Sequence, residues 1–481
     1  MNPHPHRGYL MLLALVFGAA FLTILGGLSF FVLSENKLQS RNASLAQAFS
    51  LAEAGLEYYH WFLAHYPNDL QHGTGAPGPY TISYDDPETG TAGTITLNIE
   101  GNMACGQFSS IDIESTGSPA DAPSVSRTLT ARYARPSVGS FSYILNDSVW
   151  AGADRVILGP YHSNGGVRMD GTANSPVTSS LATWSCTSSY GCSPTQNNAP
   201  GVLGNGPNQD LWSYPVPQVD FSAISADFGT LKSTAQTHGV YYPRYSTTNG
   251  QGDPAYWRGY HLIFNANGTV TVRRVSATTQ LQVVPINSAD ATTDRTLISN
   301  ESTYETRTIP ASCGLIFVED NVWIEGTIPQ KVTVVAANVV NANIAPNAYL
   351  ADNITYGAYD GTDGLTLIAE NNVLVVPDAP TNMTVNGIFI AQGGAFGRNL
   401  YLNNSRSDCH ATYEPKTSLT ILGTTVSNKR TGTKWVNGCG GGQDAGFQTR
   451  VDSYDRKMAT DPPPFTPLVS TEYQFVDWRE E

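Results

Sequence analysis

Charged residues are scarce in this sequence. Only 14% of its 481 residues are Asp, Glu, Lys or Arg, and the formal net charge is −14. Lys and Arg together number 26, and no run of them would build a basic groove. A surface of this charge repels phosphate backbones and anionic lipid headgroups, so we do not expect nucleic acid as a partner.

Motifs of catalysis and metal binding are lacking as well. The chain has no G-x-S-x-G, no H-E-x-x-H and no Walker loop. Residues 360–364 have acidic residues spaced somewhat as in a calcium loop, but the closing Glu of an EF-hand is missing, which favours a turn. We interpret His162, beside Ser163 and Asn164, as part of a polar corner between strands. The expectation is therefore a protein without enzyme activity, metal or cofactor.

Cysteines are few, and none of the six forms a CxxC pair of the zinc or thioredoxin kind. An even count in a chain exported past a membrane suggests disulfides. Cys186 and Cys192 enclose a short loop, and Cys409 and Cys439 flank a second loop-like stretch. We expect these two pairs to be disulfides, although buried free thiols would fit the same spacing.

What the sequence does have is one long apolar run near its N-terminus. Tyr9 to Leu33 contains no charged residue, and it exceeds the roughly 20 residues that a helix needs to cross a bilayer. Arg7 before the run favours an orientation with the N-terminus in the cytoplasm and the rest of the chain outside. A cleaved secretory signal is the rival interpretation, but no convincing A-x-A site follows the run.

The helical pattern continues beyond the apolar run. Apolar residues recur at steps of three, four or seven until Pro67 ends the pattern. This periodicity predicts one amphipathic helix that packs a stripe of side chains against strands of a small domain, although a juxtamembrane stalk would show the same spacing. The stripe consists of Leu38, Leu45, Phe49, Ala52, Leu56, Tyr59 and Leu63.

Two short motifs frame this helix. A basic leader ends in His6-Arg7-Gly8, directly before Tyr9, and Ala52-Glu53-Ala54-Gly55-Leu56 closes the region. In this arrangement residues 5–66 resemble the N-terminal region of PilX-type type IV pilus assembly proteins. The resemblance implies a minor pilin-like component that acts in assembly, priming or tip adhesion. It implies a prepilin peptidase cut between Gly8 and Tyr9, and contacts with other pilin subunits through the helix.

One position departs from the pilin pattern. In most pilins the fifth residue after the cut is Glu, which pairs with the amino terminus of a neighbouring subunit. Counted from Tyr9, that residue here is Leu13, and the first acidic residue is Glu35. By the same resemblance, a subunit without this carboxylate is expected at the tip of a filament, in few copies.

The rest of the chain is predicted to be mainly β. Apolar and polar residues alternate near residues 80–84, 93–97 and 129–133, which predicts a small pilin-like sheet. Short β runs broken by Gly, Asn and Pro continue to about residue 440. The pattern E-[DN]-N-V occurs at 319–322 and again at 370–373, which favours a β-solenoid, with a β-sandwich as the alternative.

Between these runs we expect an inserted α+β lobe. It has a helix capped by Asp220 and a hairpin around Asn267-Gly268. The expected organisation is a basic leader at 1–8, the helix at 9–66, a small β-sheet head at 67–136, a β-solenoid-like domain at 137–179 and 313–440, the inserted lobe at 180–312, and a C-terminal tail at 441–481.

A second function remains open. Parallel β-helix enzymes that act on polysaccharides carry Asp, Lys and Arg on one face, so an anchored carbohydrate-active enzyme is the alternative. Tryptophans in loop-like contexts suggest a surface glycan or protein ligand instead. We expect a single-pass protein of the inner or cytoplasmic membrane that can also be part of a surface filament. The candidate enzyme face consists of Asp154, Arg155, Arg168, Asp170 and Arg398.

Overall fold

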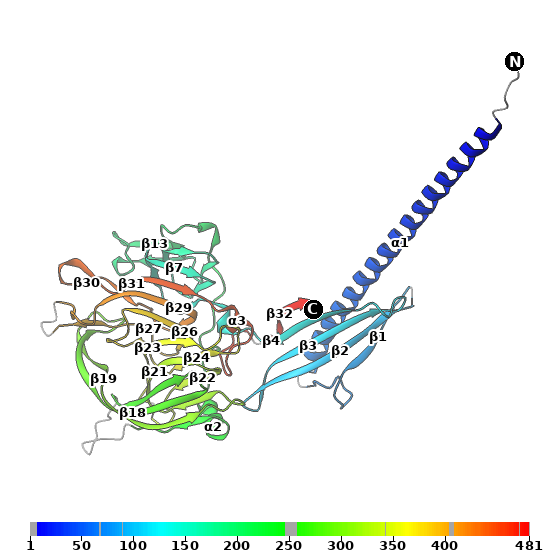
Figure 1. Ribbon diagram of the computed structural model, residues 1–481. Coiled ribbons are helices and arrows are strands. Elements are labelled where there is room, and N and C mark those ends of the chain that lie inside the picture. Colours follow the sequence, from blue (N-terminus) through cyan, green and yellow to red (C-terminus); the bar gives the residue numbers. More distant parts are fainter. Residues whose placement is uncertain are drawn as a thin grey trace. The chain divides into compact units, whose positions relative to one another are not determined.

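The computed structural model describes residues 7–66, 69–88, 90–245, 257–341, 343–403, 408–470 and 472–480. The fold is mainly β, with one long N-terminal helix (Figure 1). The chain divides into two compact units. The helix unit comprises the described residues of Met1–Gly101, Ile111–Tyr133 and Asp477–Glu481, and the solenoid unit comprises those of Asn102–Ser110 and Ala134–Val476.

The helix unit combines α1 (Arg7–His65) with a five-stranded sheet. The strand order is β1-β2-β3-β4-β32, so the last strand of the chain pairs beside β4. The solenoid unit is therefore inserted in the sequence between two neighbouring strands of this sheet. The strands are β1 (Tyr80–Asp86), β2 (Gly90–Ala104), β3 (Gln107–Pro119), β4 (Arg127–Ala134) and β32 (Gln474–Glu480).

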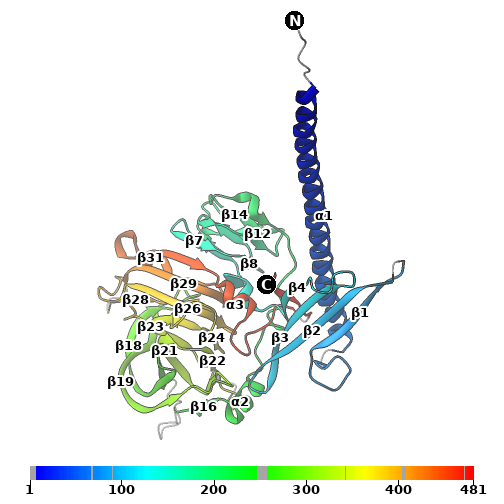
Figure 2. The same ribbon diagram turned by 45° about the vertical axis from the view of Figure 1, so that its right-hand side comes forward.

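The solenoid unit is built from short strands that stack in parallel. One ladder runs through ten strands, each pairing with its counterpart in the next coil (Figure 2). This stacking is the arrangement of a β-solenoid. In spatial order the strands are β16 (Val240–Tyr242), β20 (Leu315–Val318), β22 (Lys331–Ala336), β24 (Gly364–Ala369), β26 (Asn382–Ala391), β29 (Pro415–Ser427), β5 (Tyr143–Leu145), β8 (Tyr161–Ser163), β11 (Val177–Ser179) and β15 (Trp212–Ser213).

Further parallel ladders form the other sides of the coils. One joins five strands, another continues from β26 and β29 into three more, and a third joins three short strands. The three sets are β17 (Gly259–Asn265), β21 (Asn321–Ile328), β23 (Ala348–Tyr356), β25 (Val373–Val375) and β27 (Phe396–Gly397); β31 (Gln443–Ser453), β7 (Arg155–Leu158) and β10 (Thr172–Ala173); and β6 (Val149–Ala151), β9 (Val167–Met169) and β14 (Val202–Leu203).

Antiparallel strand pairs are added to the parallel stack. The long hairpin β18–β19 pairs through β18 with both β17 and β28, and β12 pairs with β13. Strand β30 pairs with β31, while two short helices complete the unit. These elements are β12 (Thr183–Cys186), β13 (Gln196–Pro200), β18 (Thr269–Val284), β19 (Thr292–Thr308), β28 (Leu400–Leu402), β30 (Lys434–Cys439), α2 (Phe228–Thr237) and α3 (Arg456–Thr460).

An asparagine ladder marks one corner of the coils. The side-chain oxygen of Asn321 accepts a hydrogen bond from the backbone N–H of Asn347, at 2.9 Å. The side-chain oxygen of Asn347 accepts from the backbone of Asn372, at 3.0 Å, and that of Asn372 accepts from Ala395, at 2.9 Å. Asn321 and Asn372 therefore occupy the same corner, two coils apart, as the solenoid interpretation of the E-[DN]-N-V repeat predicts.

Several strands of the ten-strand ladder, which we call the central ladder, are buried on both faces, among them β20 and β24. In β20, Ile316 and Val318 join one apolar cluster, whereas Leu315 and Phe317 join another. Such strands appear in the sequence as continuous apolar runs, because neither face meets water. The second cluster is completed by side chains from other segments, which cover this face of the stack: Phe221, Ile224, Phe228, Leu231, Ala235, Met458 and Phe465.

The coils are not stacked in the order of the sequence. Residues 143–213 form the coils at one end, but they follow β29 and β31 in space, although these lie near the C-terminus. Figure 1 shows β7, in cyan, beside β31, in orange. We call this contact the junction, defined by the pairs β29–β5 and β31–β7. It joins residues about 280 positions apart into one continuous stack.

A strap along the stack makes this order possible. Residues 214–239 run from the coil of β11 and β15 to the coil of β16, which are opposite ends of the central ladder. On the way, Val219 donates its backbone N–H to the side chain of Asn164 at 3.0 Å, and Ala226 donates to Gln392 at 2.9 Å. The strap therefore crosses both halves of the stack that the junction joins.

Buried ion pairs lie at the junction. The guanidinium of Arg155 donates two hydrogen bonds to one carboxylate oxygen of Asp452, at 3.0 and 2.8 Å, and Tyr143 donates its hydroxyl to the other oxygen at 3.0 Å. Arg450 forms a second pair with Asp154, at 2.7 Å. Each pair joins a residue of the early coils to a residue of β31, so charge is matched across the junction.

Several expected boundaries are wrong. Residues 180–312 are not a separate lobe, because β15, β16 and β17 pair within the stack. Residues 441–481 are not a tail, since they supply β31 to the stack and β32 to the other sheet. The helix within 220–236 begins later than expected. Its N-cap is Asp227, while Asp220 accepts hydrogen bonds in a preceding turn.

All six cysteines form disulfides. Cys186 pairs with Cys192 and Cys409 with Cys439, with Cα atoms 5.7 and 5.1 Å apart, as the local loops suggested. The third bond, between Cys105 and Cys313, was not expected. It joins the turn between β2 and β3 to a residue two positions before β20, over a sequence separation of 208.

The junction pair generates a stability prediction. Asp452→Ala leaves the Arg155 cation buried without its counter-ion, so we expect a loss of about 3–5 kcal/mol of unfolding free energy. The side chains of Arg155 and Asp452 are only 5% and 2% exposed. Denaturant unfolding of the full chain in detergent measures the change.

An exposed pair provides the matched control. Arg127 and Glu480 form an ion pair whose side chains are 40% and 38% exposed, so Glu480→Ala should cost less than about 1 kcal/mol. Equal losses in the two variants would contradict a special role for the junction pair.

Candidate functional site: the N-terminal helix

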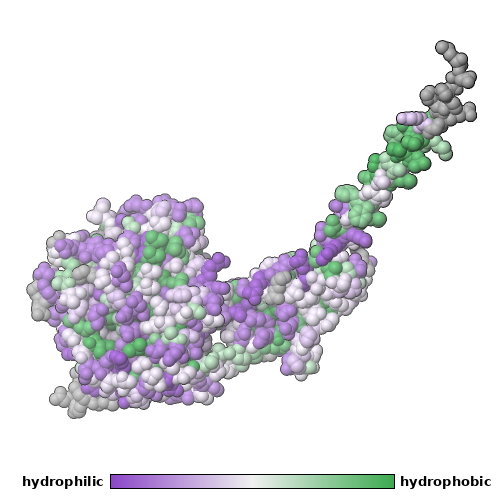
Figure 3. All heavy atoms as spheres, viewed as in Figure 1, coloured by the Kyte–Doolittle hydropathy of each residue, from purple (hydrophilic) through white to green (hydrophobic). Residues whose placement is uncertain are grey.

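Helix α1 has two halves with different surroundings. From Tyr9 to residue 43 every side chain is exposed in the structure, and most are apolar. Figure 3 shows this half as a largely hydrophobic rod. The helix is long and apolar enough to cross a membrane, with a mean hydropathy of 2.4 in its most apolar window. An apolar surface of this size needs a lipid or protein environment to cover it.

The second half of α1 packs on the sheet of its own unit. Leu51, Leu56, Tyr59 and Leu63 are buried, as the periodicity predicted for the last three. Leu45 and Phe49 are only half-buried, which corrects the expectation that they lie in the core, and Leu38 is exposed. The stripe becomes buried only where strands lie beneath it.

The A-E-A-G-L motif provides the closest approach between helix and sheet. Ala52 and Leu56 are buried, Glu53 is exposed and Ala54 is half-buried. A Cβ added to Gly55 would lie 2.2 Å from Ser115 Oγ and 2.5 Å from Ile95 Cγ2. The small residues therefore have a packing role in this chain, because a larger side chain at position 55 would push the helix off β2 and β3.

Sheet glycines meet the helix from the other side. A Cβ on Gly117 would lie 2.2 Å from the carbonyl oxygen of Ala48, and one on Gly93 would lie 2.5 Å from Leu51 Cδ1. Helix backbone and strand backbone are thus brought together by glycines on both elements. Sequence reasoning identified Gly55 but missed Gly93 and Gly117, whose helix partners could not be read from strand alternation.

The cleavage residues Gly8 and Tyr9 lie within the first turns of α1. Tyr9 is 81% exposed, and Met1 to His6 lie outside the described residues. Leu13 is 52% exposed on the same apolar half. The peptidase cut between Gly8 and Tyr9 stays a prediction.

The five charged residues of the hypothetical enzyme face do not converge. Arg155 and Asp154 serve the junction, whereas Arg168 and Asp170 pair with each other at 2.8 Å. Arg398 is fully buried and binds the carboxylate of a residue on another segment, Glu414, at 2.9 Å. Each of these groups is therefore occupied by a structural partner.

The polar corner at His162 is a set of satisfied hydrogen bonds. Its two ring nitrogens lie 2.9 Å from Thr178 Oγ1 and 3.0 Å from Asn164 Oδ1. Asn164 in turn donates to Asn146 at 2.8 Å, across neighbouring coils. Burial lowers the pKa of His162, which favours the neutral ring. The Ser163 hydroxyl donates to the carbonyl of Asp147 at 2.8 Å, so this corner too links neighbouring coils.

The acidic turn at 360–364 is also occupied internally. Asp360 accepts hydrogen bonds from the backbone and hydroxyl of Thr362, and Asp363 accepts from the backbone of Ala358. Within the described ranges, no group of three or more His, Cys, Asp or Glu is arranged to hold a metal ion. Of the tryptophans suggested as ligand-binding, Trp184 and Trp323 are buried.

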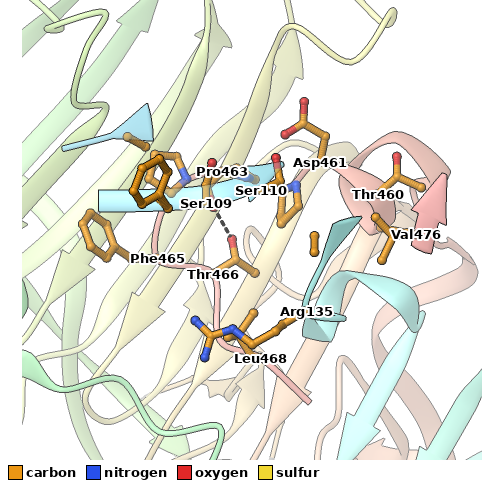
Figure 4. Close-up of a pocket in the computed structure, with 16 residues that line it drawn as sticks. Ser109, Ser110, Arg135, Thr460, Asp461, Pro463, Phe465, Thr466, Leu468 and Val476 are labelled. Carbon is orange, nitrogen blue, oxygen red and sulfur yellow. Dashed lines mark hydrogen bonds between the residues drawn. The ribbon is translucent and has the colours of Figure 1, made fainter. Parts of the chain in front are cut away.

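A pocket of about 230 Å³ lies in the solenoid unit (Figure 4). Its wall includes Pro463, Phe465, Thr466 and Arg135. Figure 4 shows the Thr466 hydroxyl turned toward Pro463, whose carbonyl it meets at 2.8 Å. The guanidinium of Arg135 lies over the ring of Tyr473, 5.3 Å from its centre. Thr466 and Arg135 of this wall therefore have partners within the protein.

Comparisons with known proteins find little. No family model matches the chain, and no curated protein matches it. Among solved structures, it is similar to the competence-associated pilin ComZ from Thermus thermophilus, with 12% identity over 91% of this chain and 97% of that one, at a TM-score of 0.33. A TM-score of this size is too low to carry an argument, so the function proposed below rests on the features of this chain.

The close packing of α1 against β2 and β3 can be tested at Gly55. In Gly55→Ala the new methyl group overlaps Ser115 and Ile95, and we expect a loss of about 1–3 kcal/mol of unfolding free energy. The matched control is Gly27→Ala, in the same helix with no neighbouring atom within 4 Å. That variant should be neutral or slightly stabilising, because Ala favours helices over Gly. Thermal unfolding distinguishes the two, and equal behaviour would contradict close packing at Gly55.

A buried histidine makes the solenoid unit sensitive to alkaline pH. Burial lowers the pKa of His261, but Glu301 from β19 and Glu325 from β21 outweigh this and raise it to about 9. Glu301 lies 2.9 Å from the ring and also pairs with Arg273 of β18. Because the folded-state pKa is raised, the stabilisation is complete below the unfolded-state value of about 6.5 and is lost as pH rises through about 9.

We therefore expect unfolding free energy to fall by about 3 kcal/mol between pH 6.5 and pH 9.5 because of His261. Burial lowers the pKa of Lys416 to about 8, which acts in the opposite direction over part of this range. The measurement is consequently the difference between the wild-type protein and His261→Gln across the same pH series. A difference that does not change with pH would contradict the stabilising role of the charged ring.

Proposed function

We propose that this chain is a membrane-anchored, pilin-like subunit of a type IV pilus or a related filament. It acts in assembly or in adhesion at the tip, and not as an enzyme. The helix passes once through the inner or cytoplasmic membrane with its N-terminus in the cytoplasm, and in a filament the same apolar surface contacts other subunits. The solenoid unit is the exposed, specialised part.

The observation that carries this proposal is the division of α1. Its first half exposes a continuous apolar surface, whereas its second half is fixed on a sheet by glycine-mediated contacts. A cleaved signal peptide would not need to continue as a helix into a folded unit. An ordinary juxtamembrane stalk would not need close packing of the helix against a sheet. The exposed apolar half of such a helix is suited to lie in the membrane before assembly and to pack against the helices of other subunits in a filament.

The alternative of an anchored carbohydrate-active enzyme has less support. Such an enzyme needs carboxylates that converge in a groove, and its candidate residues here are bound to structural partners. Asp154 pairs with Arg450 and Asp170 pairs with Arg168. A glycan or protein ligand of an adhesin remains compatible with the exposed surface, and we assign no particular one.

The finer proposal concerns position. Leu13 replaces the acidic residue that most pilins are expected to place there, so this helix has no carboxylate for the amino terminus of a neighbouring subunit. A carboxylate in hydrocarbon costs about 2.5–3.5 kcal/mol on insertion scales, and it is retained where a partner compensates for it. We therefore place this PilX-type subunit at the start or the tip of the filament, in few copies.

Processing is the first test of the proposal. The expected mature N-terminus is Tyr9, produced by a cut after Gly8, and N-terminal sequencing of the membrane form checks it. Gly8→Val should block the cut and leave the leader in place, whereas Gly18→Val, at a distance from the leader, should be processed normally. An intact Met1 in the wild-type protein would refute processing by a prepilin peptidase.

Copy number is the second test. Quantitative mass spectrometry of sheared surface filaments should find this chain far below the level of the major subunit. A ratio near one would overturn the tip assignment, and absence of the chain from filaments would overturn the filament proposal itself.

A further inference from the structure

The turn between β2 and β3 carries a feature that the proposed function does not require. The stems of these two strands belong to the helix unit, whereas the described tip, Asn102–Ser110, belongs to the solenoid unit. The turn is tight, with φ of 53° at Cys105 and 78° at Gly106. Cys105 is bonded to Cys313, the residue that leads into β20.

The tip also has noncovalent contacts within the solenoid unit. The backbone N–H of Cys105 donates to the carbonyl of Ser312 at 2.9 Å. On either side of the turn, Met103 is 53% exposed and Phe108 is 48% exposed. Cys105 and its partner Cys313 are 4% and 1% exposed, and Ser110 at the end of the tip is 5% exposed. Ala104 and Phe108 also line the pocket beside Pro463 and Phe465, so the tip has some apolar contact besides the bond.

The other end of the bond is firmly held. Cys313 precedes a strand whose residues Leu315 to Val318 are all buried and which pairs with β16 and β22. The tip is thus covalently attached beside a strand that lies second from the β16 end of the central ladder. The chain also passes between the units at residues 133–134 and 476–477, where no disulfide supports it.

We propose that the Cys105–Cys313 disulfide is a clip that carries tension. It keeps the β2–β3 tip in the solenoid when the solenoid is pulled away from the N-terminal helix. The source of that tension rests on the proposed function, because an anchored subunit that binds a surface is pulled from both ends. With the bond intact, force passes from β2 directly to residue 313, so residues 106–312 cannot be drawn out. That segment could otherwise extend by about 700 Å.

Single-molecule force spectroscopy on the full chain in detergent, with handles at both termini, tests the clip. After β32 has detached, we expect wild-type protein to resist separation of the units to a higher force than Cys105→Ala/Cys313→Ala. The variant should also reach a longer final extension, by about 700 Å. The matched control is Cys186→Ala/Cys192→Ala, whose bond spans a sequence separation of only 6 in the same unit and should not change the separation force. Equal separation forces in wild type and the Cys105 variant would overturn the proposal.

Hydrogen exchange provides a second measurement that does not depend on refolding of a variant. Reduction and alkylation of the native protein should raise amide exchange in 102–110 at least tenfold, while amides of β20, β22 and β24 keep their protection. Unchanged protection of the tip after the bond is cut would also overturn the clip. Both measurements use purified protein, so they can succeed or fail independently of whether the chain is found in filaments.

Discussion

The solenoid depends on a parallel contact between its earliest and its latest strands. Strands β5 and β7 add to β29 and β31 as if they were the next coil, and Arg155 meets Asp452 across the contact with almost no exposure to water. A buried ion pair contributes little net stability compared with apolar side chains, but an incorrectly paired register would leave both charges unmatched. The pair is therefore suited to specify the register at the junction, where the strands are not neighbours in sequence.

The asparagine corner and the ion pairs serve different parts of this stack. Coils that follow one another in the sequence are joined by short turns, and ladders such as Asn321–Asn347–Asn372 satisfy their buried polar groups. At the junction no turn connects the coils. Side chains must then align them, and Asp452 accepts hydrogen bonds from both Tyr143 and Arg155.

Much of this architecture could be predicted, and the reasons for success and failure are physical. The helix, the local disulfides and the Asn321–Asn372 corner depend on patterns within short stretches. The expected lobe at 180–312 was wrong because β16 and β17 belong to coils whose partners lie far along the chain. Cys105 likewise finds Cys313 only once both have folded into one unit, and Gly117 shows its role only when the helix lies on it.

The order of coils also has a consequence for synthesis. Tyr143 pairs with Thr425, so an early coil is complete long before the strand that it stacks on has been made. At about 5–20 residues per second, the interval between the two is on the order of tens of seconds. During this time β5 and β7 have an open strand edge, which is a site for incorrect pairing. The stack therefore cannot form progressively from the N-terminus. The early coils must stay protected or unfolded until β29 and β31 have been synthesised.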